Sequence, residues 1–401
     1  MSAPKLRFNE FNDEWIENNL GSVCSFSKGK DLSKADLYET GEPCILYGEL
    51  YTKYGPVINE VHSRTAKNSD SLIKAKKYDV LIPSSGETAI DIACASSLNL
   101  DNVLIGGDLN ILTPSTEVNG HFLSYQINGK RKYKLSTLAQ GATVTHLYAD
   151  SIKKLSCYFP SYDEQKKITS FLQLIDQKIQ LQQEKINLLK EKKKGYMQKI
   201  FNQELRFKDA NGKSFPNWEG KLVSDILKLN LREVDKPTNA YMRLGLRSHA
   251  RGTFHELVTN VESVSMDKLY VVHEGDFIIN ITFAWEQALA VADNTDHGKL
   301  VSHRFPTYLF KENHHKDFYK YFFTTKYFKY CLGNASPGGA GRNRVLNKAA
   351  FMNIQVNIPT FDEQLLISNF LSNLDKKLLF EEQKLELLQQ KKQAFMHQMF
   401  V

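Results

Sequence analysis

Side chains that could recognise the edges of DNA bases lie in a few short stretches of the sequence. Discrimination between base pairs in a groove requires directional hydrogen-bond donors, chiefly from Arg, Asn, Gln and Lys. In the second half of the chain the candidates are Arg243, Arg247, His249 and Arg251, and then Arg342, Asn343 and Arg344 after a glycine-rich loop. In the first half they are Lys74, Lys76, Lys77, Ser84, Ser85, Thr143, Thr145 and His146. Each could instead be a solvated surface residue.

Motifs of several common catalytic sites are incomplete. The G-K-S ending of a phosphate-binding loop occurs at 212–214, but its leading glycine would fall on Phe207. None of the 11 prolines is adjacent to another, so the Pro-Pro-aromatic site of adenine methyltransferases is missing. The glycines at 338–341 lack dinucleotide-loop spacing, and His314-His315 is not part of a zinc motif. A divergent nuclease site, which needs only scattered carboxylates and a lysine, stays open. We predict no catalytic or metal-binding residue.

Composition and charge indicate the class of protein. The chain has 401 residues, enough for two or three domains, and 42% hydrophobic with 24% charged residues is typical of globular proteins. A formal net charge of +7 weakly favours an anionic partner. The five cysteines are scattered, which argues against a disulfide framework or a cysteine zinc site. No secretory signal or membrane-spanning run is recognisable, so we expect a cytoplasmic location.

The strongest signal is an internal repeat with an offset of 199 residues. Residues 159–201 align without a gap on residues 358–400, and 16 of the 43 positions are identical. The same offset relates the Leu-Arg-Phe tripeptide at 6–8 to the one at 205–207. The chain therefore consists of two halves. Each half has a variable globular part followed by a similar segment of about 40 residues.

Each repeated segment has the pattern of one long amphipathic helix. Apolar residues recur at alternating three- and four-residue steps along its length, which is a heptad seam, and Pro160 and Pro359 mark the two helix starts. Equivalent polar residues interrupt the seam, namely Gln182 with Glu381 and Lys193 with Lys392. One helix cannot bury such a stripe alone, so we expect the two helices to pack on each other. The alternative is that each packs only on its own globular part.

The globular parts have the pattern of an α/β (mixed α+β) fold. Turn residues bound short β-rich runs, at 78–83, 102–105, 275–280 and 288–292, and one aromatic-rich helix is expected at 319–330. We predict two globular domains, separated by two long helices that pair as an antiparallel coiled coil, in a pseudo-twofold tandem repeat. The expected bounds are 1–160 and 206–358 for the domains, and 161–205 and 359–401 for the helices.

Together these features resemble the specificity subunit of type I restriction-modification systems, over essentially the whole chain. In that family, two variable domains are each followed by a helix that begins P-x-x-[DE]-E-Q-x-x-I. The matching residues are Pro160, Glu164, Gln165 and Ile168, and Pro359, Glu363, Gln364 and Ile367. The run at 140–147 is similar to the loop that commonly precedes the helix, whereas 337–344 departs from it in sequence but not in placement.

The resemblance implies that the globular parts are target-recognition domains, each recognising one half of a bipartite DNA site. The helices would be conserved spacers, and the subunit would have no catalysis of its own. Two modification subunits would bind it and methylate adenine N6, and two restriction subunits could join and cut DNA. S-adenosylmethionine, ATP and Mg²⁺ would act through those partners, with no cofactor in this chain. A coiled-coil scaffold or a divergent nuclease without a sequence-specific role is the alternative.

Antiparallel pairing of equivalent helices gives a separate expectation about the DNA. It relates the attached domains by a pseudo-twofold axis, and DNA has twofold symmetry between its strands, so the domains would recognise opposite strands. Because the domains differ in sequence, the half-sites should differ. An untouched spacer of about half a turn to one turn of DNA should separate them.

Two sets of helix residues each allow two interpretations. The residues of the first turns could stabilise the helix starts through the helix dipole, or could form a docking surface for modification subunits, and these are Glu164, Gln165, Glu363 and Gln364. A run of lysines could contact spacer phosphates or form a solvated helix face, and these are Lys190, Lys192, Lys193 and Lys194.

Overall fold

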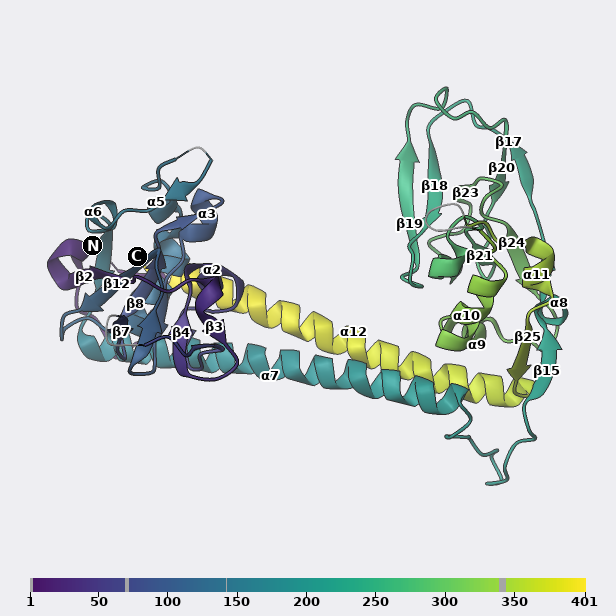
Figure 1. The fold of residues 1–401 in the computed structure, drawn as a ribbon, viewed down its shortest axis with the longest axis horizontal. Helices are drawn as coiled ribbons and strands as arrows, with labels where there is room; N and C mark the ends of the chain where they lie inside the picture. Colours follow the sequence, from purple (N-terminus) through teal and green to yellow (C-terminus); the bar gives the residue numbers. More distant parts are fainter. Residues whose placement is uncertain (1–2, 69–71, 142, 339–343) are drawn as a thin grey trace. The chain divides into compact units, whose positions relative to one another are not determined.

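The fold of the chain is given by a computed structural model that describes residues 3–68, 72–141, 143–338 and 344–401 (Figure 1). The chain divides into two compact units. The N-terminal unit comprises residues 1–184 with 382–401, and the second unit comprises residues 185–381. This division cuts across the expected domain bounds, because each unit combines a globular part with parts of both long helices.

The globular part of the N-terminal unit contains two five-stranded sheets. The first has the order β2 (Cys24–Lys28), β12 (Leu109–Pro114), β8 (Val80–Pro83), β10 (Ser96–Leu98), β5 (Val57–Ile58). The second has the order β3 (Leu37–Tyr38), β6 (Ser63–Thr65), β4 (Glu42–Ile45), β11 (Val103–Ile105), β7 (Ile73–Ala75). Two small sheets pair β1 (Ile16–Asn19) with β14 (Ser156–Phe159), and β9 (Ser85–Gly86) with β13 (Thr145–His146). The short helices are α1 (Leu20–Val23), η1 (Lys34–Asp36), α2 (Tyr47–Thr52), α3 (Ala89–Ile92), α4 (Gly120–Gln126), the π-helix η3 (Ile127–Arg131), α5 (Lys132–Ser136) and α6 (Ala149–Ile152).

The second unit has a four-stranded and a five-stranded sheet. Their orders are β16 (Leu227–Leu229), β24 (Thr307–Phe310), β21 (Phe277–Ile279), β22 (Leu289–Val291), and β17 (Glu233–Asp235), β20 (Lys268–Val271), β23 (Leu300–Val301), β18 (Tyr241–Leu246), β19 (Thr253–Val258). A further pair joins β15 (Glu219–Leu222) to β25 (Gln355–Ile358). The short helices are α8 (Val223–Ile226), η4 (Ala284–Glu286), α9 (Lys316–Phe322), α10 (Lys326–Asn334) and α11 (Lys348–Met352).

The two units share part of their strand order although their globular sequences differ. The order β2-β12-β8-β10 in the N-terminal unit corresponds to β16-β24-β21-β22 in the second unit. In the other sheet, the parallel pair β4 and β11 corresponds to the parallel pair β18 and β23. The central strands β8 and β21 are buried at every residue, which explains their continuous apolar runs. The mixed α/β fold is therefore confirmed.

The long helices α7 (Tyr162–Phe201) and α12 (Phe361–Gln398) pack on each other within each unit. In the N-terminal unit, the ring of Phe171 near the start of α7 meets the ring of Phe395 near the end of α12, with centroids 5.0 Å apart. In the second unit, Tyr196 and Phe370 make the reciprocal contact at 5.1 Å. The start of each helix thus meets the end of the other, as expected for an antiparallel pair, and packing on the globular parts alone is excluded.

The two lysines at polar seam positions form ion pairs between the helices. In the N-terminal unit, Lys392 Nζ lies 2.5 Å from Asp176 Oδ1, whose Oδ2 accepts a hydrogen bond from the Tyr125 hydroxyl. In the second unit, Lys193 pairs with Asp375, which accepts a hydrogen bond from the hydroxyl of Tyr321. The two lysines are 199 residues apart in the sequence, and so are the two aspartates. A polar contact that needs a partner on the other helix favours one register.

The N-terminal segment is hydrogen-bonded to the end of α12, and the segment that follows α7 makes the equivalent bond to the end of α7. The backbone N–H of Leu6 donates to the carbonyl of Gln398 at 2.9 Å, and both termini lie in the N-terminal unit (Figure 1). The equivalent bond in the second unit joins Leu205 to Lys199 at 3.1 Å within one continuous segment. The first residues of the chain therefore complete the packing around its last helix.

Most elements expected from sequence are present, with one exception. The four β-rich runs form β8, β11, β21 and β22. The single helix expected at 319–330 is wrong, because the structure has α9 and α10 there, and the Thr325 hydroxyl caps α10 by accepting from the N–H of Phe328. Among the described helices, none is both long enough and apolar enough to span a bilayer.

Candidate nucleic-acid interface

A hairpin in the second unit brings three of the expected DNA-contacting residues together. Strands β18 and β19 pair over their full length, and the loop 247–252 between them holds Arg247, His249 and Arg251, all exposed. The fourth residue, Arg243, lies on β18 opposite Glu256 and forms an exposed ion pair with it at 2.6 Å. The loop is thus the most basic exposed turn of this sheet, and Arg243 is partly neutralised.

The backbone of this loop is held in an uncommon conformation. His249 and Ala250 have positive φ angles of 62° and 51°, which residues with a Cβ adopt only when other contacts hold them there. The N–H of Arg247 closes the hairpin on the carbonyl of Gly252 at 3.0 Å. The Arg247 guanidinium lies over the ring of Phe254 with 5.3 Å to the centroid, and Arg251 Nε donates to the carbonyl of Ser248 at 3.1 Å. The two arginines are therefore oriented before any ligand binds.

The second basic stretch of this unit is only partly described. Arg342 and Asn343 lie outside the described residues. Arg344 is half-buried, donates to the carbonyls of Gly333 at 2.8 Å and Ser336 at 3.1 Å, and lies over the ring of Trp285 at 5.3 Å. These contacts use its Nε and one terminal nitrogen and hold this loop, and recognition of a base by Arg344 stays a prediction.

In the N-terminal unit the small β9–β13 sheet brings four candidates together. Ser85 lies opposite His146, and Thr145 lies opposite Gly86. Ser84, Ser85 and Thr145 are buried, His146 is half-buried, and Thr143 is exposed. Ser84, Ser85 and Thr145 are thus buried away from direct base contact, whereas His146 and Thr143 remain accessible at the surface. The hydroxyl oxygen of Ser84 has no hydrogen-bond partner in the described part of the chain.

The three lysines Lys74, Lys76 and Lys77 lie elsewhere in this unit. They occupy β7 and the turn after it, and Figure 1 shows β7 at the opposite edge of the unit from α3, which follows β9. All three are exposed, and Lys74 pairs with Glu42 at 2.8 Å. The structure therefore does not join these lysines to the β9–β13 candidates.

Two further exposed residues, Tyr47 and Tyr51, lie on α2. Helix α2 follows β4 and precedes β5, a strand of the other sheet, and β6 comes after β5. The whole segment between β4 and β6, which includes α2, corresponds in sheet order to loop 247–252 between β18 and β19. Both tyrosines are 37% exposed. Sequence patterns did not single them out, because the segment contains no cluster of basic residues.

One hydrogen bond fixes the loop before the spacer helix in both units. The N–H of Leu147 donates to the carbonyl of Ser84 at 3.0 Å, and that of Leu346 donates to the carbonyl of Ile281 at 2.8 Å. Both donors are related by the 199-residue offset, and both acceptors follow the buried central strand of their sheet. In both units, therefore, the loop before the long helix is joined to the end of the central strand, although the side chains of these segments differ.

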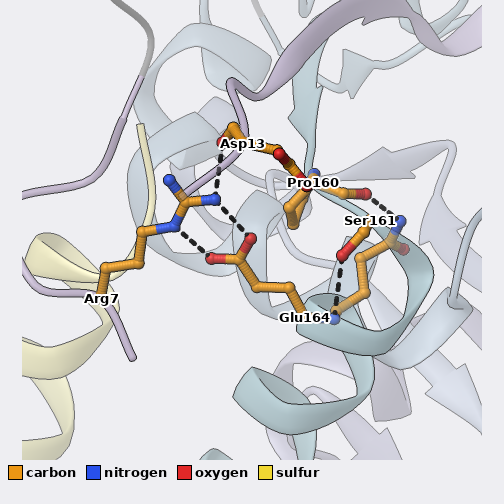
Figure 2. A network of polar contacts seen from close by, with 6 residues as sticks. Arg7, Asp13, Pro160, Ser161 and Glu164 are labelled. Carbon is orange, nitrogen blue, oxygen red and sulfur yellow. Dashed lines mark hydrogen bonds and ion pairs between the residues drawn. The ribbon is translucent and has the colours of Figure 1, made fainter. Parts of the chain in front are cut away.

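The first turn of α7 is held inside the N-terminal unit rather than offered to a partner (Figure 2). Glu164 is 1% exposed and accepts from both Nε and Nη2 of Arg7 at 2.8 Å, while Arg7 Nη2 also donates to the carbonyl of Asp13. Gln165 is also 1% exposed; it accepts from the N–H of Asn119 at 2.8 Å and donates to the carbonyl of Pro160 at 3.0 Å.

The first turn of α12 repeats this arrangement. Glu363 accepts from Nε and Nη2 of Arg206 at 2.7 and 2.8 Å, and Gln364 accepts from the N–H of His315 at 2.9 Å. Glu363 is fully buried and Gln364 is 1% exposed. A partner could contact these glutamates and glutamines only after the internal bonds broke. In the structure the four residues fasten each globular part to its helix, and a docking role for them stays a prediction.

The lysine run on α7 splits between two environments. Lys193 is half-buried in the helix seam against Asp375. Lys190, Lys192 and Lys194 are exposed, and Lys194 lies 3.9 Å from Glu191 on the same helix. A solvated face with one seam residue describes them better than a phosphate-binding stripe, and contact with spacer DNA stays a prediction for the exposed three.

Comparison with known proteins gives one family. Residues 12–191 and 228–390 match the family described as type I restriction modification DNA specificity domain. A curated relative is the type I restriction enzyme MjaVIII specificity subunit of Methanocaldococcus jannaschii. It is 20% identical over an alignment of length 411, which covers 96% of this chain and 92% of that protein.

Two solved structures have a similar fold. The S subunit of a type I restriction-modification system from M. genitalium aligns with a TM-score of 0.56 and 15% identity, over 100% of this chain and 99% of that chain. A chain from a study of complex assembly and conformational transition of the type I R-M system aligns with a TM-score of 0.58 and 13% identity, over 96% and 97%. At these identities the likeness shows the fold.

Proposed function

The chain belongs to the type I restriction modification DNA specificity family, and we propose that each of its two globular units recognises one half of a bipartite, asymmetric DNA site. As a specificity subunit it recognises DNA and is not itself an enzyme. In the second unit, loop 247–252 would contact bases and phosphates. In the N-terminal unit, Thr143, His146 and the tyrosines of α2 would do so.

The observation that supports this proposal is that the two units combine a similar backbone arrangement with different exposed side chains. The order of four strands in one sheet and the bond from Leu147 or Leu346 repeat, whereas the exposed residues do not. The second unit presents an arginine loop, and the N-terminal unit presents hydroxyl and aromatic groups. Arginine pairs best with guanine, while hydroxyl groups contact several bases. Because the exposed residues of the two units differ, we expect the two DNA half-sites to differ.

The paired helices would set the distance between the half-sites. We propose that modification subunits assemble with this chain, two to a complex, and methylate adenine N6 from S-adenosylmethionine. Restriction subunits would add cleavage driven by ATP and Mg²⁺. None of these cofactors is proposed to bind this chain. The exposed faces of α7 and α12, rather than their buried first turns, are the surfaces left for such partners.

A map of N6-methyladenine across a genome tests the function directly. Cells with the modification subunit are compared with and without this chain. The expected result is a two-part asymmetric motif, methylated once on each strand, that disappears with the chain. An unchanged map, with the modification subunit active, would favour the scaffold or nuclease alternative. A continuous or palindromic motif would contradict the two-unit reasoning.

Arg251→Ala tests the assigned face. A base-contacting arginine is worth about 1–3 kcal/mol, which corresponds to roughly 5- to 150-fold in affinity. The assembled complex should therefore bind its site more weakly and accept other bases at one position. Lys268→Ala removes the same charge from β20, where Lys268 pairs with Asp235 at 2.6 Å, and should leave the motif unchanged. Equal behaviour of the two variants would refute the assignment.

A further inference from the structure

A single helical turn, η4, lies at the centre of the contacts around the arginine loop. It follows the buried strand β21 directly, and its last residue, Glu286, precedes Gln287, whose φ angle is 57°. Segments with such backbone angles persist only where surrounding contacts over-determine them. In this turn those contacts run in two directions, toward the arginine loop and toward the core.

Three hydrogen bonds join this turn to the arginine loop. The N–H of His249 donates to the carbonyl of Glu286 at 2.6 Å, and the N–H of Ala250 donates to the carbonyl of Gln287 at 2.8 Å. The hydroxyl of Ser248 donates to Glu286 Oε2 at 2.7 Å. These bonds hold the two loop residues that have positive φ angles. Two of the bonds are between backbones, so Ser248 to Glu286 is the side-chain contact that substitution can remove.

The other side of the turn is anchored in the core. Gln287 is 6% exposed, and its Nε2 donates to the carbonyls of Phe323 at 3.1 Å and Thr325 at 3.3 Å. These carbonyls lie in the break between α9 and α10, and the Phe323 side chain is fully buried. The loop that presents Arg247 and Arg251 is thereby connected to a fixed part of the core through hydrogen bonds alone.

The charge of Glu286 has no obvious use at a DNA-binding face. A carboxylate there repels phosphate, and in the described structure its hydrogen-bond donor is the Ser248 hydroxyl rather than an arginine. An acidic residue in such a place therefore requires another reason, and the acceptor it offers to Ser248 is one. Preorganised loops lose less conformational entropy on binding and tolerate fewer wrong partners.

We propose that Ser248 and Glu286 are positioning residues for DNA specificity: their hydrogen bond holds Arg247 and Arg251 in the geometry that recognises one half-site. This inference rests on the proposed function, since it assumes that the loop contacts DNA. Loss of the bond leaves both arginines and the charge-driven attraction to DNA in place. Discrimination between bases should then fall more than overall binding.

Four variants of the full chain, each expressed with the modification subunit, separate position from charge. Glu286→Ala removes both the charge and the acceptor, whereas Glu286→Gln removes the charge and keeps an oxygen for the hydroxyl. Ser248→Ala removes the donor. Ser263→Ala is the matched control, because its hydroxyl donates to the carbonyl of Asn260 in an exposed turn of the same unit.

Methylation maps give the expected result. Glu286→Ala and Ser248→Ala should each raise methylation at sites with one wrong base by roughly tenfold, the effect of about 1.4 kcal/mol of lost discrimination. These sites should differ from the wild-type motif only in the half-site that the second unit recognises. The half-site of the N-terminal unit should stay unchanged and is an internal control. Glu286→Gln should keep the wild-type motif, and Ser263→Ala should not change it. A fifth variant, which combines Ser248→Ala with Glu286→Ala, should be no more relaxed than either single variant.

Several outcomes would overturn the proposal. Equal relaxation by Glu286→Gln and Glu286→Ala would mean that charge, not position, matters. An unchanged motif in Glu286→Ala and Ser248→Ala would mean that the bond is dispensable. Loss of methylation at all sites in both would assign the pair to folding alone. A wild-type chain that directs no motif would instead refute the proposed function on which the inference rests.

Discussion

Substituting Arg7 by alanine should destabilise the N-terminal unit more than a surface change on α7, the helix that carries its partner Glu164. Glu164 is 1% exposed, and the donors to its carboxylate in the described structure are Nε and Nη2 of Arg7 (Figure 2). Hydrogen bonding to Glu164 correspondingly raises the pKa of Arg7. Removing one partner of a buried ion pair leaves an uncompensated charge, which costs about 3–5 kcal/mol.

The repeat provides an internal comparison for this magnitude. Glu363, the equivalent residue of the second unit, accepts from Arg206 and also from Trp218 Nε1 at 3.2 Å. The corresponding Trp15 Nε1 is buried without a partner in the described residues. Arg206→Ala therefore leaves one donor on its carboxylate, and a hydrogen bond to a charged group is worth about 1.5 kcal/mol or more. We expect Arg206→Ala to cost less than Arg7→Ala by about that amount.

Hydrogen exchange resolved by peptide, in the full chain, measures each unit separately. Arg7→Ala should speed exchange in the N-terminal unit, and Arg206→Ala in the second. Adding Glu164→Gln to Arg7→Ala should recover part of the loss, because a neutral amide removes the unpaired charge. Lys166→Ala is the control, since Lys166 and its partner Asp163 are exposed, and it should change stability by less than about 0.5 kcal/mol. The reasoning is refuted if Arg7→Ala resembles Lys166→Ala.

Three further predictions concern stability. Gly195→Ala should stabilise the chain by about 1 kcal/mol, because an added Cβ meets nothing within 4 Å and the equivalent position of the repeat is Ala394. The expected result is a higher urea midpoint with an unchanged slope, and a lower midpoint would contradict this. Burial lowers the pKa of His121 to about 4, so the unfolded chain binds the proton first and stability should fall by about 3 kcal/mol from pH 6.5 to 4. In denaturation at several pH values, His121→Gln should lack that part of the loss, and an identical profile would exclude His121 as its source. Lys392→Met should cost about 1–3 kcal/mol in the N-terminal unit, because Asp176 then keeps only the Tyr125 hydroxyl among its described partners, and calorimetry showing no loss would make the seam ion pair dispensable.

The repeated pattern made much of the architecture predictable. Helix α7 begins at Tyr162 and α12 at Phe361, each two residues after the expected proline. Hydrophobic periodicity is a local property, so the seam and the central strands could be recognised from neighbouring residues alone. The single helix expected at 319–330 failed for a local reason too, because the cap at Thr325 was hidden in a continuous aromatic pattern.

The roles of individual site residues were less predictable. Glu164 and Arg7 are 157 residues apart, as are Glu363 and Arg206, and no periodicity connects such positions. The signal that could have found them is their joint recurrence at the 199-residue offset, which suggested function rather than contact. Arg344 likewise has the residue type of a base contact, but the carbonyls that engage it became neighbours only on folding.

The repeat, the two long helices, their polar seam positions and the family could be recognised from the amino-acid sequence, because these depend on spacing along the chain. Which candidate residues are exposed and which fasten the fold depended on tertiary contacts. Sheet order related the segment that contains α2 to loop 247–252, and burial withdrew Ser84, Ser85, Thr145 and the four first-turn residues from the surface. Exposure and hydrogen-bond partners are set by segments distant in sequence, so only the folded chain distinguishes a contact residue from a structural one.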